Sequence, residues 1–150
     1  MKVNLGSGEM PMDGWTNVDQ YVPADVMGDF RTLDFHDLDE VYMSHALEHV
    51  SWRDVPALLA RIRGWMRPGA RFKVEVPDMQ AIMRHPPVEW LIYVYGGQAH
   101  QGEYHQSGYT AESLGRLLTD AGFANVAVRT FDSTHPYRPG MPCLEATGYA

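Results

Sequence analysis

Short apolar runs that end at glycine or polar residues dominate the first third of the chain. Val3-Asn4-Leu5 stops at Gly6-Ser7-Gly8, and the next run ends on Asp19. Short runs bounded by turn residues are typical of buried strands. The pattern therefore predicts four short strands before residue 45, at about 2–5, 15–19, 24–27 and 40–44.

Two later segments carry apolar residues with a 3.6-residue period, which predicts helices with one buried face. The first follows Ser51, a predicted N-cap, although Pro56 predicts either a later start or a bend. It is expected to end at Arg67-Pro68-Gly69, and its apolar positions are Val55, Leu58, Leu59, Ile62 and Met66. The second begins after Thr110, a predicted cap, and ends at Gly122; its apolar positions are Leu114, Leu117, Leu118 and Ala121.

The remaining segments complete an alternation of strands and helices. Residues 71–76 alternate apolar and charged side chains, as a strand does, and 79–84 fit a short helix. Residues 88–109 are rich in Gly, His, Gln and Tyr and are interpreted as a partly helical lid. Two last strands, at 125–131 and 143–149, are expected to form an antiparallel pair. Together these elements predict an α/β three-layer sandwich on a mostly parallel, Rossmann-like sheet.

Composition and net charge restrict the number of domains, the possible partners and the expected location of the protein. The chain has 150 residues, one cysteine and a formal net charge of −7. We interpret residues 1–150 as a single domain, and the lone Cys143 excludes an intrachain disulfide. An acidic chain lacks the basic face that a nucleic-acid backbone requires, so no nucleic acid is expected as a partner. Without a signal peptide or a long apolar run, the sequence predicts a soluble cytoplasmic protein with no membrane contact.

The first strand and its glycine loop suggest a ligand site. Gly6 and Gly8 carry no Cβ, so the backbone can turn sharply there and approach a ligand closely. Asp19 follows the next strand, where a carboxylate can accept both hydroxyls of a ribose. Alternatively, Gly-x-Gly is a plain turn and Asp19 a solvated strand-end carboxylate.

Several segments, in this order, resemble the class I S-adenosylmethionine-dependent methyltransferases, in particular a small branch often found near cell-wall or polysaccharide genes. They include Leu5-Gly6-Ser7-Gly8, Gly14-Trp15-Thr16-Asn17-Val18-Asp19, His45-Ala46-Leu47-Glu48-His49, Met66-Arg67-Pro68-Gly69-Ala70-Arg71, Tyr95-Gly96-Gly97-Gln98 and Ala121-Gly122-Phe123. The resemblance implies the family's fold, here with a shortened first helix. It also implies S-adenosylmethionine as cofactor, S-adenosylhomocysteine as product and a small polar methyl acceptor such as a sugar.

The resemblance also implies a role for each matching residue. Asp19 would hold the ribose hydroxyls, and Asp29 would accept from the adenine amino group beside Phe30. The methionine and ribose part would lie against Leu5, Gly6, Ser7 and Gly8. Ser44 and His45 would face the sulfonium and the acceptor. If the acceptor needs a general base, the candidates are His45, His49 and His105, since a histidine can take a proton near neutral pH.

Two departures from the family pattern keep other functions open. Asn4 stands where the family usually has an acidic residue, and the 9–14 segment leaves no room for the usual helix after the first strand. One alternative is therefore a catalytically inactive cofactor-binding or scaffold protein. The same departures predict that a second copy of the chain or a partner subunit covers an open cofactor site.

A further alternative comes from His45-x-x-Glu48-His49, the inverted zinc-peptidase motif. On a helix, both histidines would face one zinc ion and the glutamate would act as base. The motif directly follows a predicted strand, so a loop or single turn is favoured. Our assignment therefore includes no metal ligand.

Overall fold

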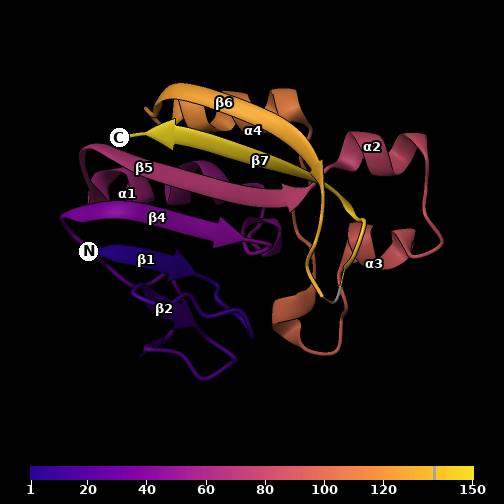
Figure 1. Cartoon of the computed structure of the whole chain (residues 1–150), viewed down its shortest axis with the longest axis horizontal. Coiled ribbons are helices and arrows are strands. Elements are labelled where there is room, and N and C mark those ends of the chain that lie inside the picture. The colour runs from indigo at the N-terminus through magenta and orange to yellow at the C-terminus, as the bar shows by residue number, and fades with distance from the viewer. Residues whose placement is uncertain (137) are drawn as a thin grey trace.

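A computed structural model describes residues 1–136 and 138–150, and its centre is a seven-stranded sheet (Figure 1). The strands lie in the order β3-β2-β1-β4-β5-β7-β6. All pairings are parallel except those of β7, which runs antiparallel to both β5 and β6. The bounds are β1 Lys2–Leu5, β2 Thr16–Asp19, β3 Val26–Met27, β4 Leu38–Ser44, β5 Met66–Pro77, β6 Ala124–Asp132 and β7 Pro142–Tyr149.

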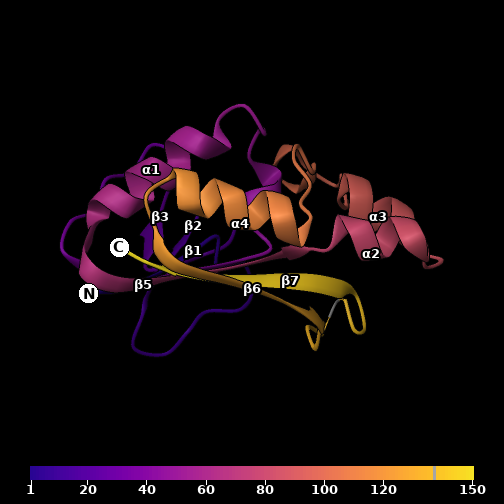
Figure 2. The same ribbon diagram turned by 90° about the horizontal axis from the view of Figure 1, so that it is seen from above.

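Two helices, α1 (Val55–Trp65) and α4 (Ala111–Asp120), lie side by side on one face of this sheet (Figure 2). Two short helices, α2 (Met79–Arg84) and α3 (Trp90–Tyr95), lie beyond the carboxyl end of β5. Single 3₁₀ turns follow β4 and α3: η1 (Leu47–His49) and η2 (Gln101–Glu103). The predicted lid, residues 88–109, is thus partly helical.

The observed ends of α4 and α1 confirm one predicted helix cap and correct another. Thr110 caps α4 as predicted, because its side chain accepts from the Ser113 N–H while Ser113 bonds back to the Thr110 N–H. The predicted cap at Ser51 is wrong: α1 begins at Val55, after Asp54, with Pro56 in its first turn, where a missing N–H costs nothing. The predicted stop at Arg67-Pro68-Gly69 comes too late. Met66 is already extended and begins β5.

The core lies between the sheet and the two long helices. Alternate side chains of the central strands point to that side, and Val3, Leu5, Val41, Met43 and Phe72 are fully buried. The apolar stripes of α1 and α4 meet them, with Leu59, Ile62, Leu114 and Leu118 also fully buried. This packing fixes the strand ends that carry the candidate site.

The other face of the sheet carries no helix among the described residues, which corrects the three-layer prediction to two layers (Figure 2). The physical reason is that the short connections from β1 to β2 and from β2 to β3 form turns and loops rather than helices. The α/β class, the mostly parallel sheet and the antiparallel last strand are confirmed. In place of a second helical layer, polar side chains pair across the strands of the uncovered face.

Glu145 on β7 is the most strongly paired residue of this polar face. Arg129 donates two hydrogen bonds of 2.7 Å to it, and Lys73 lies 2.7 Å from its Oε2. The Arg129 hydrogen bonds, opposed by partial burial and helped by Lys73, lower the pKa of Glu145 to about 2. The carboxylate therefore contributes to folding stability when it is ionised.

We predict that Glu145→Gln lowers the free energy of unfolding by about 1–3 kcal/mol at pH 7. A folded-state pKa below the unfolded value stabilises the fold above the unfolded pKa, and this stabilisation is lost as pH falls toward 2. Urea unfolding should thus show a deficit at pH 7 that shrinks by pH 3. The control is Glu112→Gln on α4, which breaks an exposed pair with Arg116 and should cost under about 0.5 kcal/mol. Equal effects of the two substitutions would contradict this account.

None of the described helices combines the length and apolar character needed to cross a membrane.

Candidate functional site

A cavity of about 440 Å³ opens at the carboxyl ends of β1, β2 and β4. Ligands of open α/β sheets bind at this edge. Its walls come from the glycine loop after β1, the segments after β2 and β3, the turn after β4 and the lid. The lining residues are Gly6, Gly8, Asp19, Gln20, Tyr21, Val22, Asp29, Phe30, Arg31, His45, Ala46, His49, Val50, His100, Gln101, Gly102 and Gln106.

The glycine loop is fixed to β2, and its first glycine has no room for a side chain. The N–H groups of Gly6 and Ser7 donate to the Val18 carbonyl at 2.8 and 3.0 Å, which fixes the loop to β2. Gly6 has a φ of +68°, and a Cβ there would lie 2.6 Å from the Ala46 Cβ. The side-chain oxygen of Ser7 is buried and has no hydrogen-bond partner among the described residues.

Asp19 is buried, and its carboxylate holds the loops on either side of it. Oδ2 accepts from the Gly8 N–H at 2.8 Å, while Oδ1 accepts from the N–H groups of Tyr21 at 2.7 Å and Val22 at 2.9 Å. Each carboxylate oxygen can accept more than one hydrogen bond. Three of its roughly four acceptor sites are used, so the group shapes the cavity and Oδ2 still offers a lone pair to a hydroxyl donor.

Asp29 faces the cavity while pairing with Arg31. The Arg31 Nε lies 2.8 and 2.9 Å from the two carboxylate oxygens. Partial burial would raise the pKa of Asp29, but the hydrogen bonds and charge of Arg31 outweigh burial and lower it. Asp29 therefore stays ionised, and a ligand amino group would have to share it with Arg31.

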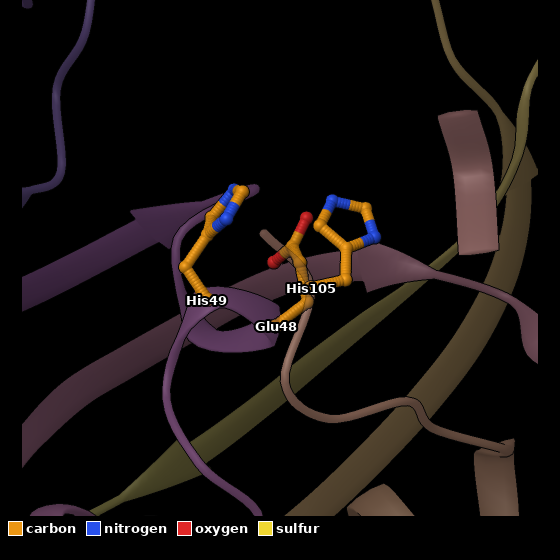
Figure 3. A group of neighbouring side chains, drawn as sticks. All are labelled: Glu48, His49 and His105. Carbon is orange, nitrogen blue, oxygen red and sulfur yellow. The ribbon is translucent and has the colours of Figure 1, made fainter. Parts of the chain in front are cut away.

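Four polar side chains gather where β4 ends and the lid returns: His45, Glu48, His49 and His105. His45 has a φ of +51°, which is unusual for a residue with a Cβ, and its Nδ1 lies 3.2 Å from Glu48 Oε1. The Glu48 carboxylate lies beside the rings of His49 and His105 (Figure 3). The two ring centroids are 4.8 Å apart.

Burial and charge oppose each other in this cluster. Burial of Glu48 would raise its pKa, but the hydrogen bond from His45 and the three histidine rings lower it to about 2. Burial lowers the pKa of His105, although Glu48 acts in the opposite direction. An ionised carboxylate only accepts hydrogen bonds, so His45 Nδ1 must carry the proton that it donates to Glu48.

The lid closes one wall of the cavity against the segment after β2. The rings of Tyr21 and His100 lie 4.5 Å apart. A Cβ at Gly102 would lie 2.1 Å from a Tyr21 ring carbon, so only glycine allows this approach. The lid also reaches the turn after β4, because the N–H groups of Gln106 and Ser107 donate to the Glu48 carbonyl.

A family model described as a methyltransferase domain matches residues 16–128, which is more than half of the chain. The chain belongs to the methyltransferase domain family. No curated protein matches the sequence at a significant level.

Solved structures of methyltransferases share the fold at low sequence identity. One is an S-adenosylmethionine-dependent methyltransferase from Archaeoglobus fulgidus, with a TM-score of 0.70, 16% identity and coverage of 99% of this chain and 85% of that one. Another is 1,6-didemethyltoxoflavin-N1-methyltransferase from Burkholderia thailandensis, with a TM-score of 0.71 and 20% identity. That match covers 99% of this chain and 69% of the other, whose structure holds 1,6-didemethyltoxoflavin and S-adenosylhomocysteine.

A third structure, from Nostoc punctiforme and named as an O-methyltransferase, has a TM-score of 0.70 and 13% identity. The match covers 99% of this chain, which spans only 51% of that longer protein. These likenesses agree with the predicted Rossmann-like methyltransferase fold.

The structure of this methyltransferase brings most of the predicted site residues together and separates a few. The cavity is lined by Gly6, Gly8, Asp19, Asp29, Phe30, His45 and His49. Leu5 is fully buried in the core, and Ser7 is buried and is not part of the cavity lining. Ser44 donates to Glu75 at 3.0 Å on the uncovered face of the sheet. His105 is not in the cavity lining but lies behind His49 in the histidine cluster.

Sequence reasoning did not single out Tyr21, Val22, Arg31 or Val50 as lining residues. A usable signal existed for the first three, since Tyr21 and Val22 lie two and three positions after Asp19 and Arg31 directly follows Phe30. Nor is the His45-x-x-Glu48-His49 motif helical. It spans a positive-φ residue and a 3₁₀ turn, and His45 binds Glu48 rather than facing a shared ion with His49.

Proposed function

We propose that this methyltransferase binds S-adenosylmethionine in the cavity and transfers the methyl group to a small polar acceptor. The observation that carries the proposal is the cavity itself, where the glycine loop, Asp19, Asp29 and His45 meet at one sheet edge. Its volume is in the range of small-molecule sites. The bound S-adenosylhomocysteine of the Burkholderia thailandensis enzyme, which shares the fold, supports the same choice of cofactor.

The residues present fit such a cofactor. Gly6, which approaches Ala46 closely, and Gly8 both line the cavity and carry no Cβ, so the loop backbone is open to contact with a ligand. Asp19 would accept from the ribose hydroxyls and Asp29 from the adenine amino group, with Phe30 against the ring. When bound, the cofactor supplies a methyl group that its sulfonium has already activated.

The protein's part in the reaction is chiefly alignment. Methyl transfer is an in-line displacement, so holding donor and acceptor in register can supply much of the rate, on the order of 7–11 kcal/mol in well-aligned systems. His45 and His49 line the cavity from the turn after β4, where we place the acceptor. The lid residues His100, Gln101 and Gln106 add polar contacts on that side. A sugar or another metabolite with a hydroxyl, amine or carboxylate suits this lining.

His49 has the most suitable geometry for a general base. Its Nδ1 lies 3.2 Å from the Tyr104 carbonyl, which can only accept, so the ring proton resides on Nδ1 and Nε2 keeps a lone pair. A positioned base typically contributes about 10²–10⁴-fold. His45 and His105 are the other candidates, and His105 would act from behind His49.

One observation keeps a catalytically inactive binding protein as the second candidate. Asn4 donates to Asn17 at 3.1 Å and to the Met10 carbonyl at 3.3 Å, so its amide is engaged away from the cavity. The acidic contact that the family usually supplies from this position is therefore replaced. The turns at 9–14 also leave that flank to a second copy or a partner subunit, which we propose as the cover.

The proposal is tested by measuring S-adenosylhomocysteine release from S-adenosylmethionine in the presence of a panel of sugars, amines and carboxylates. We expect at least one acceptor class to raise release well above the acceptor-free rate, with a methylated product of matching mass. Cofactor binding with no acceptor-dependent release across the panel would favour the inactive binding protein.

A further inference from the structure

We propose that Glu48, His49 and His105 bind one divalent transition-metal ion beside the cavity. Each residue offers a ligand atom, and these atoms all lie within 4.8 Å of one another. A tetrahedral site with bonds of about 2.1 Å places its ligand atoms about 3.4 Å apart. Small side-chain rotations would bring the three into range, because the Glu48 carboxylate already lies beside both rings (Figure 3).

The two histidines are oriented as metal ligands are. His105 Nδ1 lies 3.0 Å from the Tyr93 carbonyl, and His49 Nδ1 lies 3.2 Å from the Tyr104 carbonyl. A carbonyl only accepts, so both rings carry their proton on Nδ1 and present an Nε2 lone pair. A metal-binding histidine usually donates its other N–H to such a backbone oxygen. His105 Nε2 is buried and has no hydrogen-bond partner among the described residues.

Glu48 adds an independent observation. Its side chain is 1% exposed, His45 satisfies Oε1, and Oε2 is buried with no hydrogen-bond partner in the described part of the chain. Burying a carboxylate with an unsatisfied oxygen costs folding free energy unless a cation or a hydrogen-bond donor compensates its charge. A cation held with the two Nε2 atoms would do so, while His45 would orient the carboxylate.

The donor set indicates the class of ion. Two imidazoles and one carboxylate suit Zn²⁺, Fe²⁺ or Co²⁺ better than Mg²⁺ or Ca²⁺, which prefer oxygen ligands. Three protein ligands leave a position open for an exogenous oxygen. Because His49 lines the cavity, that position adjoins the acceptor region. This inference rests on the proposed function: the ion would bind an acceptor oxygen and lower its pKa in place of the His49 base, because the Nε2 lone pair of His49 would be bound to the ion.

The test is titration of chelator-stripped, untagged protein with Co²⁺, followed by its visible absorption, and competition with Zn²⁺. We expect one Co²⁺ per chain with bands typical of nitrogen and oxygen ligands. His105→Gln and His49→Gln should each weaken binding by at least about tenfold. His36→Gln, at an exposed site between β3 and β4, is the control and should bind as the parent does. Glu48→Gln is a second ligand variant if its fold is intact by circular dichroism.

Absence of Co²⁺ binding, or equal binding by the His49, His105 and His36 variants, would overturn the metal site. The readout does not depend on activity. Titration of the same stripped protein with S-adenosylhomocysteine tests the cofactor site separately, so failure of one proposal is distinguishable from failure of the other.

Discussion

Gly6→Ala is expected to destabilise the protein by about 2–5 kcal/mol and to weaken S-adenosylhomocysteine binding at least tenfold. A side chain at a positive φ costs about 1–2 kcal/mol, and overpacking adds about 1–3 kcal/mol. Both apply at Gly6, where φ is +68° and the new Cβ would lie 2.6 Å from the Ala46 Cβ. Relief of this clash requires the loop to move away from the turn after β4, and the cavity would change shape. Urea unfolding and calorimetry measure the two effects.

Gly14→Ala is the matched control. Gly14 has a φ of +77°, but a Cβ there would meet no atom within 4 Å. It should therefore show only the backbone cost, about 1–2 kcal/mol, and leave cofactor affinity unchanged. If Gly6→Ala and Gly14→Ala had the same stability and affinity, the close approach of the glycine loop to Ala46 would contribute to neither stability nor cofactor binding.

Asp19→Ala is expected to weaken cofactor binding by about 10- to 100-fold, since hydrogen bonds to a charged acceptor are typically worth ~1.5–3 kcal/mol. The substitution also leaves three loop N–H groups without their acceptor, so a loss of stability is expected as well. Asp13→Ala, which removes the same charge from an exposed turn, is the control and should have little effect on either quantity.

Comparing two ligands separates the loss of the ribose hydrogen bond from distortion of the loops that Asp19 holds. The parent should bind a 2′-deoxy analogue of S-adenosylhomocysteine more weakly than the natural compound, while Asp19→Ala should hardly distinguish the two. Such a double cycle isolates one pairwise interaction. If the deoxy penalty were the same in both proteins, Asp19 would not contact the ribose hydroxyl.

Much of the fold was predictable because local signals and burial agreed. The buried runs of β1, β4 and β5, the capping residue Thr110 and the antiparallel β6–β7 pair follow from patterns that tertiary contacts reinforce. The start of α1 was predictable only in part: Ser51 offers a plausible cap, but Pro56 indicates a later start, and the chain becomes helical only at Val55. Similarly, the Met66 side chain fits the helical period of α1, yet its backbone begins β5.

The missing helical layer shows a limit of pattern reasoning. Strands with alternating apolar and charged residues were assigned to a sheet with two covered faces, as is usual for parallel sheets. Here the alternation itself signals a face that meets water, and the register places Glu75 opposite Glu145 between Lys73 and Arg129. The charges compensate one another across strands, which sequence spacing alone does not reveal.

The candidate site likewise contains contacts that the sequence pattern implies and contacts that it does not. Gly6, Gly8 and Asp19 meet because the carboxyl ends of parallel strands share an edge, which the sequence pattern implies. The approach of His105 to Glu48 and His49 joins residues more than fifty positions apart, through a lid whose course has no periodic signal. Likewise, the contact of Gly102 with Tyr21 depends on how that lid returns to the cavity.

The most direct test of the central claim is calorimetric titration of the metal-stripped protein with S-adenosylmethionine and, separately, with S-adenosylhomocysteine. We expect micromolar binding of both at one site per chain, with the affinity reduced in Asp19→Ala and retained in Asp13→Ala. Absence of binding for either ligand would contradict the assignment of the cavity to this cofactor.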